Sequence, residues 1–239
     1  MDRPKIICHI LQSVDGNIDG SFFSQPETMP ALQEFARIRE EYACDAVISG
    51  AATASEIYAN IIADVLPKAH ETYPRTDWQA VKADKYAVII DGQGTVHWKS
   101  GMVERRGDKM HVITILQDNV SDAYIAHLRH AGVSYVFAGK DSLDLPLAVR
   151  KLKEQFGIEK MLLSGGGIVD WAFLQAGLVD EISLVIPPVI DGGTGLASAF
   201  DDSPFAAAHN PTAMLLKDVQ RLDGDGIWLR YQIKQEKER

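Results

Sequence analysis

Two glycine-rich turns carry the residue types that bind phosphate groups. Ser49-Gly50-Ala51-Ala52-Thr53 and Ser164-Gly165-Gly166-Gly167-Ile168 each follow a short apolar run and precede a helical pattern. Small residues at a strand-to-helix turn let backbone N–H groups approach a phosphate, and the Thr53 hydroxyl adds a donor. Two such turns in one chain predict a dinucleotide ligand.

Neither turn completes a standard nucleotide fingerprint. A G-x-G-x-x-G motif needs glycine where Asp170 stands, and a P-loop needs Lys and then Ser or Thr after its last glycine. A third turn, Asp191–Gly195, is either a loop before the C-terminal hairpin or a wall beside the ligand. His127 and His130 are three residues apart on a predicted helix without a third ligand, so we predict no metal site.

These turns belong to a regular alternation of strand and helix patterns. Short apolar runs between turn residues are typical of strands covered on both faces, and apolar residues at helical spacing predict the helices. The predicted strands cover residues 5–12, 46–48, 86–90, 111–116, 134–138, 160–163 and 180–186. The predicted helices cover residues 28–42, 53–63, 121–131, 144–156 and 168–176. This order predicts an α/β fold with a mainly parallel sheet flanked by helices.

The C-terminal part departs from this alternation. Residues 214–222 and 227–233 have strand patterns joined by Asp223-Gly224-Asp225-Gly226, which predicts an antiparallel hairpin. The sequence contains no internal repeat and no low-complexity linker. We therefore predict a single domain over residues 1–239.

The composition excludes several classes of partner. The 239 residues carry 24 Lys and Arg against 33 Asp and Glu, a net charge of −9, so no overall basic surface for nucleic acid is expected. No stretch reaches the about 18 apolar residues that span a bilayer. The N-terminus lacks a signal-peptide pattern. Cys8 and Cys44 form neither a C-x-x-C pair nor a zinc-like cluster, which predicts ordinary reduced thiols. We predict a cytoplasmic protein without nucleic-acid or membrane partners.

The ordered set of motifs resembles the C-terminal reductase domain of the riboflavin-biosynthesis deaminase/reductase, and more broadly the dihydrofolate reductase-like fold. The matching segments are Ser13–Ile18, Gly50–Thr53, Gly165–Gly167 and Leu178–Ile182 with its following Pro187-Pro188 and glycine-rich turn. The C-terminal hairpin fits the same fold. The zinc-binding motifs of the deaminase domain, H-x-E and P-C-x-x-C, are absent from the sequence, so we expect a stand-alone reductase.

The resemblance implies an NADPH-dependent oxidoreductase that forms a homodimer. The residues that it places around the cofactor are Gly50, Ala51, Thr53, Leu116, Gly165, Gly166, Gly167, Ile168 and Trp171. The residues that it places on the substrate side are Ser13, Asn17, Asp91 and Ser164. The implied reaction reduces the ring-opened ribosylamino group of a pyrimidine 5′-phosphate to a ribitylamino group.

Departures from the family pattern keep other substrates open. The riboflavin enzymes follow G-x-x-T with an acidic segment, whereas Ala54–Asn60 is closer to the folate reductases, and Ser164 replaces a substrate-contacting Glu. The alternatives are a reductase of the same fold for a pterin or another small carbonyl or imine, and a nucleotide-binding protein without turnover. The stretch Leu116–Asp122 also has no Lys or Arg for the 2′-phosphate of NADPH, which must find its partner elsewhere.

Reduction of an imine or carbonyl also needs a proton source, and three carboxylates are candidates. Asp15 lies in an Asp-Gly turn, where a structural role competes with a catalytic one. Glu34 lies on the first predicted helix, near the position where folate reductases keep their pterin-binding carboxylate. Glu56 lies on the helix that follows G-x-x-T.

Overall fold

The computed structural model describes residues 2–58, 71–202 and 210–234, which form two compact units. Unit 1 comprises Met1–Pro4 and Asp45–Met161, and unit 2 comprises Lys5–Cys44 and Leu162–Arg239. The chain crosses between the units three times, so neither unit is one continuous stretch of sequence. The single domain over residues 1–239 stays a prediction.

Unit 1 is built on the parallel strands β2 (Ala46–Gly50), β3 (Tyr86–Ile90) and β5 (Asp108–Leu116), with β3 in the middle. One edge of the long strand β5 is shared. Its first half pairs antiparallel with β4 (Met102–Arg105), and its second half pairs parallel with β6 (Ser134–Phe137). Most residues of β3 and β5 are buried, as their apolar runs predict.

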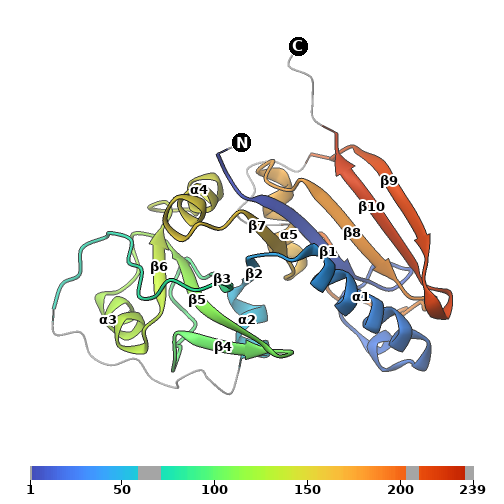
Figure 1. The fold of residues 1–239 in the computed structure, drawn as a ribbon, viewed down its shortest axis with the longest axis horizontal. Helices are drawn as coiled ribbons and strands as arrows, with labels where there is room; N and C mark the ends of the chain where they lie inside the picture. Colours follow the sequence, from blue (N-terminus) through green and yellow to red (C-terminus); the bar gives the residue numbers. More distant parts are fainter. Residues whose placement is uncertain (1, 59–70, 203–209, 235–239) are drawn as a thin grey trace, which may run out of the picture. The chain divides into compact units, whose positions relative to one another are not determined.

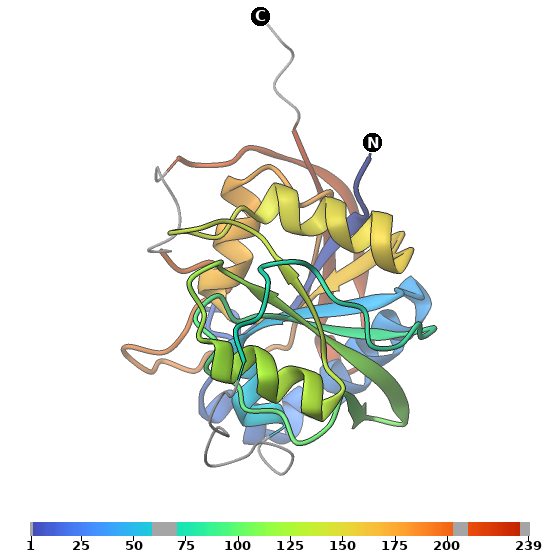
Figure 2. The ribbon, with the colours of Figure 1, turned by 90° about the vertical axis from the view of Figure 1, so that its left-hand side faces the viewer.

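The helices of unit 1 are α2 (Ala51–Ile57), α3 (Asp122–Ala131) and α4 (Leu145–Phe156), the last two drawn in light green and yellow in Figure 2. The Ser121 and Asp144 side chains accept hydrogen bonds from the backbone at the starts of α3 and α4. Both of these helices end at a glycine in the left-handed region. These local signals explain why α3 and α4 were predictable.

Unit 2 contains the strand order β1 (Lys5–Leu11), β8 (Glu181–Ile186), β10 (Ile227–Ile233) and β9 (Met214–Arg221) (Figure 1). β1 and β8 are parallel, and β10 pairs antiparallel with both β8 and β9. The predicted C-terminal hairpin is therefore confirmed.

The helices of unit 2 are α1 (Met29–Tyr42) and α5 (Gly167–Gln175), and β7 (Lys160–Leu163) crosses the boundary between the units. Short 3-10 turns at Ser21–Ser24, Pro26–Thr28 and Asp223–Asp225 also belong to this unit. The core under α1 contains Leu11, Phe22, Ala31, Ile38, Val185, Leu222 and Trp228.

The predicted α/β class, with mostly parallel strands, flanking helices and a C-terminal hairpin, is confirmed, with differences at a few elements. β4 was not among the predicted strands, because its sequence MVER has no clear apolar alternation. α2 begins at Ala51 rather than at residue 53, and residues 59–63 of that predicted helix lie outside the described residues. Within the described part of the chain, no helix is long and apolar enough to cross a membrane.

Candidate functional site

In unit 2, Asp15 joins the loop after β1 to the loop after β8. Its Oδ1 atom accepts hydrogen bonds from Ser13 Oγ at 2.5 Å and from the Asp191 N–H at 3.1 Å. Its Oδ2 atom accepts from the Gly192 N–H at 2.9 Å and from Asn17 Nδ2 at 3.2 Å. The sequence-predicted residues Ser13, Asp15 and Asn17 therefore lie together, in contact with the third glycine turn.

These donors also determine the ionisation of Asp15. The hydrogen bond from Ser13, followed by those from the Gly192 and Asp191 N–H groups, lowers the pKa of Asp15 to about 2. An acid with this pKa is ionised at neutral pH and acts there as a hydrogen-bond acceptor. The geometry thus gives Asp15 a role in holding two loops, and its role as proton donor stays a prediction.

Asp191 provides a second tie in the same region. Its Oδ2 atom accepts from the Phe22 N–H at 2.8 Å and from Ser21 Oγ at 3.3 Å, while its Oδ1 atom accepts from the Gly193 N–H at 3.1 Å. A Cβ atom on Gly20 would lie 2.5 Å from Asp191 Oδ2, so this close approach requires glycine.

An open pocket of about 440 Å³ lies beside these loops. It is lined by Ser21, Phe22, Gln25, Glu27, Pro188, Val189, Ile190 and Asp191. The third glycine-rich turn, for which the sequence left open a loop or a wall beside the ligand, contributes Asp191 to this pocket, whereas the sequence did not predict the part played by Gln25 and Glu27. These two residues lie in or beside short 3-10 turns, which have too few residues to produce a periodic pattern.

The Gly165–Gly167 turn of unit 2 leads directly into α5. Gly166, at the N-cap position, has φ 72° and ψ 130°, and α5 has no side-chain cap. A Cβ atom on Gly167 would lie 2.2 Å from the Ser198 carbonyl oxygen, so the backbone is closely approached there. Ile168 is exposed, Ser164 is half-buried and Trp171 is buried. The first N–H groups of α5 are thus not satisfied by a side-chain cap.

In unit 1, three predicted site residues lie along one edge of the sheet. The register pairs Gly50 with Ile90 and Ile90 with Ile115, so the carboxyl ends of β2, β3 and β5 are level. Gly50, Asp91 and Leu116 therefore follow one another along this edge. α2 begins at Ala51 without a side-chain cap, with Thr53 half-buried and Glu56 exposed on it.

Asp91 is 3% exposed, and protein groups occupy both of its carboxylate oxygens. It accepts hydrogen bonds from the Thr95 N–H and hydroxyl and from the Val96 N–H, all at 2.8–2.9 Å. The Tyr124 hydroxyl lies 2.8 Å from its Oδ2 atom. The structure therefore gives Asp91 the task of holding the turn after β3, and its contact with substrate stays a prediction.

A cation does lie at the loop after β5, although it comes from a distant segment. Arg75 donates to the Asp118 and Val120 carbonyl oxygens, both at 2.8 Å, and forms an ion pair with Asp122 at 2.7 Å. Its distance of 43 residues from Asp118 explains why the local sequence did not reveal it. Because Asp122 neutralises its charge and the loop takes up most of its donors, Arg75 mainly fixes the shape of the loop.

The remaining predicted acids lie on helix surfaces. Glu34 pairs with Arg37 one turn further along α1, at 2.7 Å, in an arrangement typical of a solvated ion pair. Glu56 is exposed on α2. Among the described residues no group of three or more His, Cys, Asp or Glu side chains is arranged to hold a metal ion.

The fold and the site define a class of protein: a mixed α/β protein whose glycine-rich turns follow the carboxyl ends of strands. Two of these turns lead into helices, α2 and α5, that have no side-chain cap. The family model of the RibD C-terminal domain matches residues 4–227, and the chain belongs to this family. The resemblance that the motifs predicted is confirmed at this level.

Individual relatives agree with the family. The chain is 25% identical over 238 residues to the 2,5-diamino-6-ribosylamino-4(3H)-pyrimidinone 5′-phosphate reductase of Methanothermobacter thermautotrophicus, covering 97% of this chain and 99% of the relative. An 83-residue match of 26% identity, 35% of this chain and 37% of the relative, links it to the reductase of the same name from Aquifex aeolicus. These names support an oxidoreductase.

Solved structures share the fold. A pyrimidine reductase-like protein from Corynebacterium diphtheriae has a TM-score of 0.67 at 18% identity, over 98% of this chain and 93% of that one. The riboflavin biosynthesis reductase Rib7 of Saccharomyces cerevisiae has a TM-score of 0.59 at 15% identity, over 98% and 91%. At these identities the likeness concerns the fold alone.

Proposed function

We propose that this chain is an NADPH-dependent pyrimidine reductase of riboflavin biosynthesis. Its substrate is a 5-amino-6-(5-phosphoribosylamino)uracil or the corresponding 2,5-diaminopyrimidinone, whose ring-opened ribosylamino group becomes a ribitylamino group. The observation that carries the proposal is the family match over residues 4–227, together with a relative of that substrate class that is matched over nearly its whole length.

The helix starts of the chain support a nucleotide cofactor. α3 and α4 are capped by Ser121 and Asp144, whereas α1, α2 and α5 have no side-chain cap, and α2 and α5 follow the two predicted phosphate turns. Their N–H groups suit phosphate oxygens, and the close approach at Gly167 fits a turn that brings backbone to a ligand. NADPH supplies the hydride when it is bound.

The residues of this chain would bind and orient the reactants. In unit 1, Gly50, Ala51 and Thr53 would donate hydrogen bonds to phosphate groups. In unit 2, the Gly165–Ile168 turn would do the same. Asp15 would keep the loop after β1 attached to the Asp191 loop, so that the pocket beside Phe22 keeps its shape.

The direct test is oxidation of NADPH by the purified protein with each of four compounds: the uracil substrate, the diaminopyrimidinone substrate, dihydrofolate and a simple imine. We expect rapid loss of nicotinamide absorbance with one or both of the ribosylaminopyrimidine phosphates. Turnover of dihydrofolate or the imine alone would instead favour the same-fold alternative. Tight NADPH binding without turnover of any of the four would favour a binding protein.

Cofactor preference needs a separate measurement. Arg75 is a cation at the loop after β5, the stretch that has no Lys or Arg of its own for the 2′-phosphate of NADPH, but Asp122 already pairs with it. We propose that NADPH is preferred, on the basis of the family resemblance. A ratio of kcat/KM values for NADPH over NADH well above one would support this preference, and a ratio of one or less would contradict it.

We also propose that the chain forms a homodimer through one face of the unit 2 sheet. The strand register brings Leu184, Leu229 and Val219 side by side, and Ile182, Tyr231 and Leu216 side by side. Leu216 and Val219 are 57% and 53% exposed. An exposed apolar face suits a second copy of itself, because a two-fold interface joins identical surfaces.

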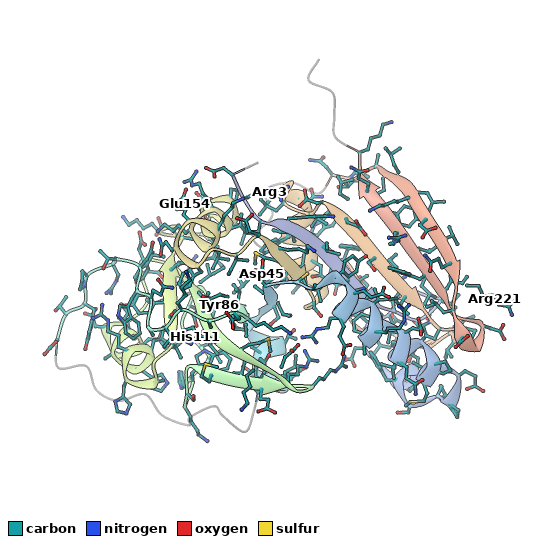
Figure 3. All side chains as sticks on the ribbon, viewed as in Figure 1. Arg3, Asp45, Tyr86, His111, Glu154 and Arg221 are labelled. Atoms are coloured by element: carbon teal, nitrogen blue, oxygen red, sulfur yellow. The ribbon has the colours of Figure 1, made fainter. Side chains whose placement is uncertain are left out.

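A bulge in the β9–β10 pairing separates apolar from charged residues. The register shifts between Arg230 and Tyr231, so Lys217 and Asp218 both point to the face where they pair with Glu181 and Arg230. The apolar face carries one charged residue within the three strands, Arg221, which is labelled in Figure 3.

Substitution separates the two faces of β9. We expect Leu216→Asp to convert a dimer into a monomer, as measured by size-exclusion chromatography with light scattering. The control is Leu215→Asp, since Leu215 is 53% exposed on the opposite face. A monomeric wild type, or dissociation by both variants alike, would refute this interface. We also propose that the protein is cytoplasmic, as its sequence predicts.

A further inference from the structure

A buried acid lies one turn into α5, directly after the Gly165–Gly167 turn. Asp170 is 1% exposed, and its Oδ1 atom has no hydrogen-bond partner among the residues that the structure describes. Its carboxyl group contacts the Cys8 thiol of β1 and the backbone N–H of Gly165. A helical side chain points back toward the helix N-terminus, so Asp170 underlies the turn that precedes it.

The surroundings of Asp170 disfavour its charged form. Burial raises the pKa of Asp170 to about 8, and the hydrogen bonds from Gly165 and Cys8 offset only part of this effect. The pKa of Cys8 is also raised, first by burial and then by Asp170. A buried carboxylate without a cation is costly, so Asp170 carries a proton at neutral pH.

The charged and titratable groups around Asp170 give it no compensating cation within the described residues. The elements that face it contribute Cys8 from β1 and the N–H of Gly165 from the turn. Asp201, on the segment that covers the turn, has a carboxylate oxygen 2.7 Å from where a Cβ atom of Gly167 would lie. Ionised Asp170 would therefore be a second negative charge near the start of α5.

That charge would oppose the binding of an anion at the turn. The start of α5 has no side-chain cap, and the partial positive charge of a helix N-terminus favours phosphate. A full negative charge one turn away would cancel it. As a neutral group, Asp170 can hold Gly165 in place without this electrostatic penalty.

We propose that Asp170 is a positioning residue for the anionic cofactor, holding the Gly165–Gly167 turn from below as a neutral carboxyl group and weakening cofactor binding when it ionises. The inference rests on the proposed function, because it takes NADPH as the ligand of the turn. It adds to that function a specific pH dependence and the residue responsible for it.

The test measures the KM for NADPH and kcat between pH 7 and pH 9 in the wild type and in Asp170→Asn. We expect the wild-type KM to rise about tenfold by pH 9, since only about a tenth of a group with a pKa of about 8 is still protonated there. The value of kcat should change much less. Asp170→Asn is neutral at every pH, so its KM should stay flat.

Glu154→Gln is the matched control, because it removes one carboxylate from the exposed surface of α4 (Figure 3). It should keep the wild-type pH dependence. A wild-type KM that does not change with pH would overturn the inference, and so would an Asp170→Asn profile that follows the wild type. The wild-type measurement is decisive even if the Asp170→Asn variant does not fold.

A second measurement separates this inference from the proposed function. Thermal unfolding of wild type and Asp170→Asn across the same pH range reports the ionisation of Asp170 without any ligand. Divergence of the two unfolding curves with pH supports the neutral carboxyl, and parallel curves contradict it. If neither protein binds NADPH at any pH, the proposed function and the ligand of this inference fail together, while the unfolding curves still decide the state of Asp170.

Discussion

Among single residues, the three aspartates Asp15, Asp91 and Asp170 have three different environments. Asp15 is exposed and surrounded by donors, Asp170 is buried without a cation, and Asp91 is buried but fully hydrogen-bonded. The sequence identified the Asp-Gly turn at Asp15 and the strand end at Asp91, because both depend on local chemistry. It gave no signal for the protonation of Asp170, since that depends on burial by segments that are distant in the sequence.

Replacement of Asp91 should destabilise the protein strongly. Asp91→Ala leaves the buried Val96 N–H and Tyr124 hydroxyl without their acceptor, so we expect a loss of about 3 kcal/mol in the free energy of unfolding. The measurement is urea denaturation followed by circular dichroism. Asp108→Ala, which removes only an exposed pair with Lys85, should cost less than about 1 kcal/mol. Equal losses in both variants would contradict the role of Asp91.

The two cysteines should differ in reactivity. Cys8 is buried and its thiol pKa is raised, whereas Cys44 is partly exposed, and neither forms a disulfide. Because the thiolate is the reactive form, a thiol reagent at pH 8 should label Cys44 within minutes and Cys8 only after denaturation. Mass spectrometry of the labelled peptides identifies the site. Fast labelling of native Cys8 would contradict its burial.

At the scale of elements, the caps and turns explain what the sequence revealed. Glycines at 132 and 157 end α3 and α4, and Ser121 and Asp144 begin them, so their boundaries were predictable to within a residue. β4 was missed because a four-residue edge strand depends on its partner β5 rather than on its own pattern. The pocket beside Phe22 depends on the packing of loops far apart in sequence, which no local pattern describes.

Substitution of Gly167 tests the turn that precedes α5. Gly167→Ala places a Cβ atom 2.2 Å from a backbone oxygen, so the turn must shift, and we expect a loss of about 2 kcal/mol in stability with a several-fold weaker NADPH affinity. Fluorescence titration with NADPH and thermal unfolding measure the two effects. Gly226→Ala is the control, since its nearest atom would be 3.4 Å away, in ordinary contact. An unchanged affinity in Gly167→Ala would argue against this turn as a cofactor site.

At the scale of the whole molecule, the order of predicted elements is confirmed, but the division into two units could not be predicted. The boundaries at Pro4, Cys44 and Met161 follow no linker composition, because they depend on which segments pack together. The apolar face of the unit 2 sheet was equally hidden, since the bulge changes which residues of β9 share a face. The sequence shows which residues of β9 are apolar, but which of them share a face of the sheet depends on the register of its pairing with β10.

The pH dependence of global stability follows from two buried groups of unit 2. Burial lowers the pKa of His9 to about 4, so its contribution to stability is complete above about pH 6.5 and is lost as the pH falls to about 4. The raised pKa of Asp170 has the opposite effect: its contribution is complete below about pH 4 and is lost as the pH rises to about 8. Between pH 6.5 and 8 only Asp170 of these two groups acts.

We therefore expect wild-type stability to fall by about 2 kcal/mol between pH 6.5 and pH 8, as measured by urea unfolding. Asp170→Asn should remove this slope and leave the loss below pH 6.5 that His9 causes. A wild-type stability that is constant or rises between pH 6.5 and pH 8 would show that Asp170 is already ionised in the folded protein.

The division of unit 2 between both ends of the chain has a consequence for synthesis. β1 is made early, but its partner β8 lies about 170 residues later, as the Ile6–Asp180 hydrogen bond between positions 174 residues apart illustrates. While the ribosome is still working, the apolar β1 segment emerges without its partner and is exposed to association with other chains. The segment Asp45–Met161 is complete 20 residues before β8 begins at Glu181, so nascent chains should acquire unit 1 first and should rely on chaperones to protect β1 until β8 emerges.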